Sequence, residues 1–310
     1  MAAGFDSGTA SRIVRRGVGG SMSAVDASAV IVAPQGWRRL LRGLATDPRS
    51  AAGLALVGIA IVAALFAPLI APVDPELPDF VNILAPPSTS HLFGTDELGR
   101  DVLARIVYGA RASLFVGVLS VAAAAVVGTL IGLVAGYFGR WADALLMRLM
   151  DIIFAFPSIL LALAITAVLG PSLTNAVLAI AVVNLPVFAR LARAQTLVVS
   201  RLEFVEAKRA LGFGTANILL RTVLPNIQAP LIVQGSLLFA SAIITESYLS
   251  FLGLGAQPPT PTWGNMLRNA IGFLELAPWL AWFPGAAIFL IVLGCNLLGD
   301  GLRDRFDPRD

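Results

Sequence analysis

The chain has 310 residues, of which 57% are hydrophobic and only 13% are charged, and its mean hydropathy is +0.82. Soluble domains carry about 25% charged residues, so this composition excludes an ordinary soluble protein and indicates an integral membrane protein. The formal net charge of +3 is therefore interpreted as a signal of membrane topology, and not of nucleic-acid binding. The single cysteine, Cys295, excludes an intrachain disulfide bond and is expected to be a small buried hydrophobic residue.

Residues 1–49 are expected to form a tail before the first membrane span. They contain a basic cluster at Arg38, Arg39 and Arg42, and residues 37–44 are expected to form a short amphipathic segment. They lack an apolar core followed by a cleavage site, so we do not expect a cleaved signal peptide. The sequence leaves open whether translation starts at Met1 or at Met22.

Uncharged runs of around 20 residues are long enough to cross the hydrocarbon core of a bilayer. One run, residues 152–189, is too long for one span, and the turn signal Gly170-Pro171-Ser172 divides it. The predicted spans are residues 50–73, 112–139, 152–169, 173–189, 222–245 and 276–299. The predicted fold is therefore all-α, with a six-helix transmembrane domain at residues 50–307 and a short tail at 308–310.

Small residues and prolines mark the spans further. Gly128, Gly132 and Gly136 recur at every fourth position of the second span, which predicts a face for close helix packing, with pore lining as the alternative. Pro157 and Pro186 lie inside predicted spans and are expected to kink or loosen them.

Basic residues are distributed unequally between the two sides. With a cytoplasmic N-terminus, segments 1–49, 139–151, 190–226 and 299–310 face the cytoplasm and carry 18 of the 22 Lys and Arg residues. Positive charge concentrates in cytoplasmic loops, so both termini are predicted to be cytoplasmic.

The segment 190–226 is far longer than a turn requires. Residues 202–211 are good helix formers, and Gly212 is suited to end that helix in the left-handed conformation. Thr215 is expected to cap a second short helix that runs to Val223. Ala207, Ala210 and Gly212 leave the first helix with a bare side, which another body can approach closely. An interfacial helix on lipid headgroups is the alternative.

The stretch EAKRALG, followed after eleven residues by Leu-Pro, resembles the EAA loop of ABC-importer permeases. Lys208 departs from that pattern, in which alanine is usual. The resemblance implies that the segment is a coupling helix that seats in a groove of an ATPase subunit. The implied coupling residues are Glu206, Ala207, Arg209, Gly212, Leu224 and Pro225.

Three further stretches resemble the C-type subunit of the dipeptide, oligopeptide and nickel branch. They are DPRSAAGLALVG, HLFGTDELGRDVLARIVYGARASL and ESYLSFLGLGAQPPTPTWGNML, so that the similarity covers roughly residues 47–307. It implies a type I ABC-importer permease in a bacterial cytoplasmic membrane. The implied partners are a homologous B-type permease, two ATPase subunits and an extracytoplasmic binding protein. Dipeptides, longer peptides, glutathione-like peptides and nickel chelates remain open as substrates, and so does whether the two ATPases are identical.

The chemistry of an enzyme is missing from the sequence. No G-x-x-x-x-G-K-[ST] loop surrounds the sole lysine, Lys208, so ATP and Mg²⁺ are expected to bind to the partner ATPases and no cofactor to this chain. No cluster of metal ligands is present, and the sole histidine, His91, is expected to be an exposed loop residue. A secondary transporter, which needs intramembrane charges, and a membrane enzyme are the rival functions.

A few charges near the spans are candidate functional residues. Asp96, Arg100 and Asp101, with Arg105 and Arg111, are expected to form an ion-paired cap that acts as an outer gate or contacts the binding protein, or that is purely structural. Glu246 has two interpretations: a gate or packing residue, or a plain residue of the outer membrane interface. Asp151 is expected to stabilise a helix start beside Arg148.

Overall fold

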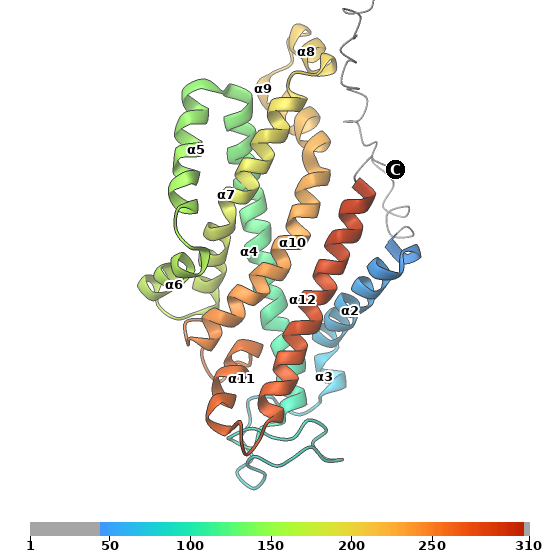
Figure 1. Cartoon of the computed structure of the whole chain (residues 1–310), viewed down its shortest axis with the longest axis vertical. Coiled ribbons are helices and arrows are strands. Elements are labelled where there is room, and N and C mark those ends of the chain that lie inside the picture. Colours follow the sequence, from blue (N-terminus) through green and yellow to red (C-terminus); the bar gives the residue numbers. More distant parts are fainter. Residues whose placement is uncertain (1–43, 307–310) are drawn as a thin grey trace, which may run out of the picture. The chain divides into compact units, whose positions relative to one another are not determined.

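The computed structural model describes residues 44–306, and in this part of the chain the fold is helical (Figure 1). The α-helices are α2 (Pro48–Leu65), α3 (Ala67–Ile70), α4 (Val102–Phe138), α5 (Arg140–Phe154), α6 (Ser158–Leu169), α7 (Leu173–Val199), α8 (Glu203–Ala210), α9 (Thr215–Ile218), α10 (Leu224–Phe251), α11 (Trp263–Ala270) and α12 (Trp279–Phe306). A π-helical turn, η2 (Leu219–Val223), joins α9 to α10. The basic cluster at 38–42, most of the amphipathic segment 37–44 and the tail 308–310 lie outside the described residues.

Within residues 44–306, five helices are long and apolar enough to cross a membrane: α2, α4, α7, the continuous run Thr215–Phe251, and α12. The pair α5 and α6 makes a sixth crossing if it is counted as one span. The helices differ from the predicted spans mainly at their ends. For example, α4 has 37 residues and begins ten residues earlier than predicted. At 1.5 Å per residue it is about 55 Å long, so it extends beyond a hydrocarbon core of about 30 Å.

The predicted third span, residues 152–169, is wrong as a single helix. The α5 helix already begins at Arg140, and α5 and α6 meet at an angle of 89°. Pro157 lies at this break as the residue before α6. Because proline has no N–H and its ring clashes with the preceding turn, the helix stops here and a new one starts in another direction.

The glycines of α4 form its contact with α7. A Cβ on Gly132 would lie 2.4 Å from the carbonyl oxygen of Ala189, and one on Gly128 would lie 2.7 Å from the Leu185 oxygen. Real Cβ atoms do not approach a backbone this closely, so only glycine fits at these positions. The prediction of a close packing face is confirmed, and the alternative that this face lines a pore is wrong.

The α10 helix lies between the other long helices, with α4, α7, α11 and α12 as neighbours. One apolar cluster joins α2, α4, α10, α11 and α12 around Ile243, Trp263 and Ile291. Cys295 belongs to this cluster and is buried, as expected. A second cluster around Val102, Met266 and Leu280 joins the start of α4 to α11 and α12.

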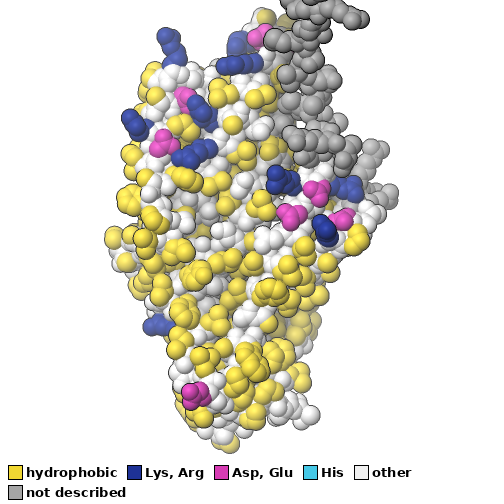
Figure 2. Space-filling model, in the orientation of Figure 1, with side chains coloured by type: hydrophobic (Ala, Val, Ile, Leu, Met, Phe, Trp, Pro, Cys, Tyr) yellow, Lys and Arg dark blue, Asp and Glu magenta, His cyan; other side chains and the backbone are white. Residues whose placement is uncertain are grey.

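The short helices and the long loop lie at the two ends of the helical domain. The α8 helix lies at one end, close to the C-terminal end of α7, and the loop 71–101 lies with α11 at the opposite end (Figure 1). Hydrophobic side chains cover the middle of the visible face, and most Lys and Arg side chains on it lie toward the end that carries α8 (Figure 2). This distribution suits a domain whose middle faces lipid.

Candidate functional site

The candidate coupling segment is shorter than the predicted interval 190–226. The α7 helix continues ten residues beyond its predicted end, to Val199, and the next long helix already starts at Thr215. Between them the chain turns at residues 200–202, forms α8, and turns again at 211–214. Both flanking helices are therefore rigid up to the short segment that carries α8.

The end of α8 is formed as predicted at Gly212. This residue has φ +79°, and its N–H donates to the Arg209 oxygen at 3.0 Å, while the N–H of Phe213 donates to the Lys208 oxygen at 3.2 Å. These two bonds make a Schellman motif, in which a left-handed residue lets the chain satisfy the last carbonyls of the helix. The acidic Glu203 and Glu206 lie in the first turn and Lys208 and Arg209 in the last, which suits the helix dipole.

The predicted second short helix is not separate from the next span, because α9 continues through η2 into α10. Residues 215–251 form one continuous helical run, and its N-cap is Gly214, so the prediction of Thr215 as the cap is wrong. The run contains a π-helical turn in which the Leu224 N–H donates to the Leu219 oxygen, five residues back. Pro225 follows directly, and the wider turn accommodates its ring where a regular α-turn would clash.

Two side chains of α8 fix it to the membrane helices. The Nζ of Lys208 donates to the Oγ1 of Thr222 in the π-helical turn at 2.9 Å, and Thr222 is itself buried. The guanidinium of Arg209 lies 5.3 Å from the ring centre of Tyr137, near the end of α4. Lys208, which departs from the usual EAA pattern, therefore joins α8 to the start of the long helix behind it.

The outward side of the segment is open. Glu206 and Ala207 are exposed, and a Cβ on Gly212 would meet no atom of the described residues within 4 Å other than those of its chain neighbours. The large apolar side chains of Leu211 and Phe213 are 76% and 46% exposed. Leu211 and Phe213 were not among the predicted coupling residues, although their position on either side of the predicted Gly212 stop was a usable signal. A bare helix side with an apolar tip is suited to insertion into a groove of another protein.

At the opposite end, Asp96 is the centre of a buried ion-paired cluster. Its Oδ2 accepts from Arg100 Nε at 2.7 Å and lies 3.3 Å from Arg105 Nε. The side chains of all three residues are 7% exposed or less. Arg100 also donates to Glu97 Oε1 at 2.9 Å. The predicted pairing is present, but it is a buried network and not the exposed cap that the sequence suggested.

Asp101 and Arg111 lie outside this cluster. Asp101 is the N-cap of α4, where its Oδ1 accepts from the Ala104 N–H at 2.8 Å, and its Oδ2 lies 3.1 Å from His91 Nδ1. His91 lies in a loop, as expected, but its side chain is half-buried beside Asp101, so the expectation that it is exposed is wrong. Arg111 donates to the carbonyl oxygens of Ala64 and Leu65 at the end of α2. The gate function of the loop residues stays a prediction.

Glu246 is fully buried in α10, so it is not an exposed residue of the outer interface. Ser250 donates to its Oε1 at 2.7 Å, and Ser113 of α4 donates to its Oε2 at 3.2 Å. These bonds satisfy both oxygens and join α10 to α4. The packing interpretation of this residue therefore agrees with the structure, whereas a gate function stays a prediction.

Two ion pairs fix α5 to α7. Asp151 lies in the last turn of α5 and accepts from Arg190 Nη2 at 2.8 Å, so the prediction that it stabilises a helix start beside Arg148 is wrong. Asp143 accepts two hydrogen bonds from Arg193. Both pairs lie on the α8 side of the break at Pro157. In residues 44–306 no group of three or more His, Cys, Asp and Glu side chains is placed to hold a metal ion.

More than half of the chain matches one protein family. The family described as binding-protein-dependent transport system inner membrane component matches residues 128–309, which include α8 and the long helix behind it. The chain belongs to this family. A further description, the N-terminal transmembrane domain of oligopeptide transport permease C, matches residues 36–87 of this permease. Members of this family are components of binding-protein-dependent transport systems, which favours a permease over the secondary transporter and the membrane enzyme.

The permease has relatives of similar length. A dipeptide transport system permease protein, DppC, of Alkalihalophilus pseudofirmus is 48% identical over 273 residues, covering 88% of this chain and 90% of that protein. A glutathione transport system permease protein, GsiD, of Pectobacterium atrosepticum is 46% identical over 274 residues, covering 88% of this chain and 90% of that protein.

A solved structure shares the fold of the permease. It is an inward-facing conformation of the MetNI methionine ABC transporter, with a TM-score of 0.52 and 17% sequence identity. The match covers 65% of this chain and 95% of that chain. At this identity the likeness shows a fold in common, the type I ABC-importer permease fold, and nothing about the substrate.

Proposed function

We propose that this permease is one half of the pore of an ATP-driven peptide importer, and that α8 docks into an ATPase subunit. The observation that carries the proposal is the shape of the segment at 200–214. It presents a short helix with a bare side and two exposed apolar side chains, Leu211 and Phe213, between two long rigid helices. An interfacial helix needs a continuous apolar face against lipid, whereas here the apolar residues gather at the tip.

ATP and Mg²⁺ would bind to the ATPase subunits, because this sequence has no phosphate-binding loop. Closure of two ATPases would move α8, and its bond to Thr222 would pass the motion to the continuous helix 215–251. That helix reaches the far end of the domain, where α11 and the loop 71–101 lie. Such a rigid-body movement of packed helices would alternate access between the two sides. A homologous second permease would complete the pore.

The relatives support peptides as the substrate class. The DppC relative is named for dipeptides, and the GsiD relative for glutathione, so glutathione is the second candidate. An extracytoplasmic binding protein would deliver the substrate. In this arrangement the basic end with α8 faces the cytoplasm of a bacterium, in agreement with the 18 basic residues on the predicted cytoplasmic segments.

The function is tested by uptake in proteoliposomes that contain the assembled transporter. We expect labelled dipeptide or glutathione to accumulate only with ATP, the binding protein and the ATPase subunits present. This chain purified alone should show no ATP hydrolysis above background. Hydrolysis by the lone subunit, or import without ATPase subunits, would contradict the proposal.

The orientation is tested by thiol labelling of intact cells. In a Cys295→Ala background, a cysteine at the exposed Ser88 should react with an impermeant reagent from outside. A cysteine at the equally exposed Thr215 should react only after the membrane is opened. Labelling of the Thr215→Cys variant in intact cells would reject the proposed topology.

A further inference from the structure

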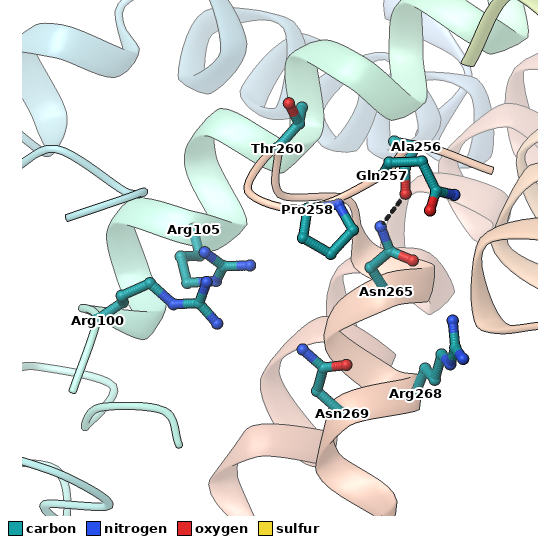
Figure 3. Close-up of a pocket in the computed structure, with 9 residues that line it drawn as sticks. All are labelled: Arg100, Arg105, Ala256, Gln257, Pro258, Thr260, Asn265, Arg268 and Asn269. Atoms are coloured by element: carbon teal, nitrogen blue, oxygen red, sulfur yellow. Dashed lines mark hydrogen bonds between the residues drawn. The ribbon is translucent and has the colours of Figure 1, made fainter. Parts of the chain in front are cut away.

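A small polar pocket lies between the start of α4 and α11, at the end of the domain opposite α8. The loop 256–260, which is made of bends and turns, passes along the pocket, and two of the pocket's arginines come from α4 and from the residue just before the N-cap of α4 (Figure 3). Its polar lining includes the side chains of Arg100, Arg105, Arg268, Asn265 and Asn269. None of the nine lining residues is acidic, and three are arginines.

Two of the arginines are held in place from behind. Arg100 is bonded through Nε to Asp96 and through Nη2 to Glu97. Arg105 is bonded through Nη1 to the carbonyl oxygen of Pro75 at 2.8 Å, and its Nε lies beside Asp96. These contacts fix both planar guanidinium groups while the chain is folded. A fixed guanidinium loses little conformational entropy when it binds a planar anion.

The donors that remain face the pocket. Among the described residues, Nη1 of Arg100 and Nη2 of Arg105 have no hydrogen-bond partner, although both side chains are about 95% buried. Arg268 at the pocket rim is exposed and has neither a hydrogen bond nor an ion pair in the described part of the chain. In Figure 3 the guanidinium groups of Arg100 and Arg105 point into the pocket from one side, and Arg268 lies on the other side, beyond Asn265 and Asn269. The Arg268 guanidinium lies beside Gly253, at the rim of the pocket.

The neutral side chains offer few competing donors. The amide of Asn265 already donates to the Ala256 oxygen at 2.5 Å, and that of Asn269 donates to Glu97 at 2.9 Å. The Gln257 amide likewise donates to the carbonyl oxygens of Gly253 and Gly255. The charged donors of the pocket are all guanidinium N–H groups. Arginine forks match the geometry of a carboxylate and bind it with charge-assisted bonds. Asp96 and Glu97 neutralise the two buried arginines, so Arg268 leaves a local excess of positive charge.

We propose that this pocket binds one carboxylate group at the outer face of the permease. Two sources present that chemistry: the C-terminal carboxylate of a peptide, and an acidic side chain of a binding protein. The carboxylate site itself follows from the pocket, whereas the choice between the sources rests on the transport role proposed above. The experiment therefore has one arm for the site and one for its source.

The first arm measures the site without transport. Phenylglyoxal reacts with accessible arginines, and peptide mapping by mass spectrometry gives the rate at Arg268 in the assembled transporter. We expect excess N-acetylalanine to slow the reaction at Arg268, and N-acetylalaninamide, which lacks the carboxylate, to have no effect. The control is Arg148, which is exposed and has no ion-pair partner among the described residues. Its rate of reaction with phenylglyoxal should be the same in the presence of N-acetylalanine and of N-acetylalaninamide. Equal rates at Arg268 with the acid and the amide would overturn the proposal.

The second arm compares Arg268→Gln, Arg268→Lys and the control Arg148→Gln. Arg268 is exposed, so its replacement leaves the buried Asp96 network intact. If the binding protein supplies the carboxylate, Arg268→Gln should weaken its binding to the transporter about two- to fivefold, the range of an exposed ion pair. If the substrate supplies it, that affinity should stay normal while the KM for a dipeptide rises by a similar factor.

Arg268→Lys should retain part of the affinity in either case, because the charge remains. The proposal would also be overturned if Arg268→Gln and Arg148→Gln had the same affinity for the binding protein and the same KM for a dipeptide. A wild-type complex that neither binds a binding protein nor imports peptides would instead refute the proposed function. The labelling arm would then still decide whether the pocket takes a carboxylate.

Discussion

Replacement of Gly212 by valine should uncouple the transporter without unfolding the membrane domain. Gly212 has φ +79°, where a residue with a branched Cβ is strained by about 1–2 kcal/mol. Apart from its two chain neighbours, the new Cβ would meet no atom of residues 44–306 within 4 Å, so the cost expected from these residues is confined to the backbone of the turn. A free-energy change of this size lowers the population of the Schellman turn by a factor of about 5–30. The added side chain also projects from the exposed side next to Leu211 and Phe213.

The assay is co-purification of the ATPase subunits with the permease, together with ATP-dependent uptake. We expect Gly212→Val to insert at normal levels, to retain fewer ATPase subunits and to lose uptake. The affinity of the binding protein for its substrate should be unchanged, since that protein is a separate chain. Glu206→Lys, which reverses a favourable charge near the start of α8, should weaken docking in the same direction.

A matched pair of serine variants separates backbone strain from bulk. Gly212→Ser places the side chain at positive φ, whereas Gly214→Ser places it at φ −64°, in an N-cap position that serine favours. Both sites are open to solvent. We expect only the Gly212 variant to lose ATPase subunits. Full coupling in Gly212→Val and Glu206→Lys would refute the docking role of α8 and return it to an interfacial helix.

Three further replacements test the interactions that hold the domain together. Lys208→Met removes the hydrogen bond from α8 to Thr222. It should lower the uptake per ATP hydrolysed, while the ATPase subunits still co-purify. Unchanged uptake per ATP would show that other contacts position α8. Arg100→Ala removes one partner of the buried Asp96 carboxylate. Because breaking a buried ion pair costs about 3–5 kcal/mol, the amount of the protein in the membrane should fall. A normal amount would mean that water or Arg105 compensates for the lost partner. Gly132→Leu forces a side chain against the Ala189 backbone and should separate α4 from α7, seen as a lower melting temperature in detergent; a wild-type melting temperature would contradict the close contact.

The sequence by itself determined the features that depend on local chemistry. Apolar runs as long as a bilayer is thick predicted the membrane class and most of the spans, and the asymmetry of Lys and Arg predicted a topology. The helix stop at Gly212 was also predictable, because a helix end depends on the few residues around it and on the tolerance of glycine for positive φ. The glycines of α4 were recognisable from their spacing alone.

Only the tertiary structure decided which charges are buried and which residues they pair with. Glu246 receives a bond from Ser113, which is 133 residues away, and Asp151 pairs with Arg190, which is 39 residues away. A sequence reports the neighbours of a residue along the chain, whereas burial depends on elements that meet only after folding. For the same reason the pocket of Arg100, Arg105 and Arg268 had no sequence signal, since two of its arginines precede α4 or lie in its first turns and the third comes from α11.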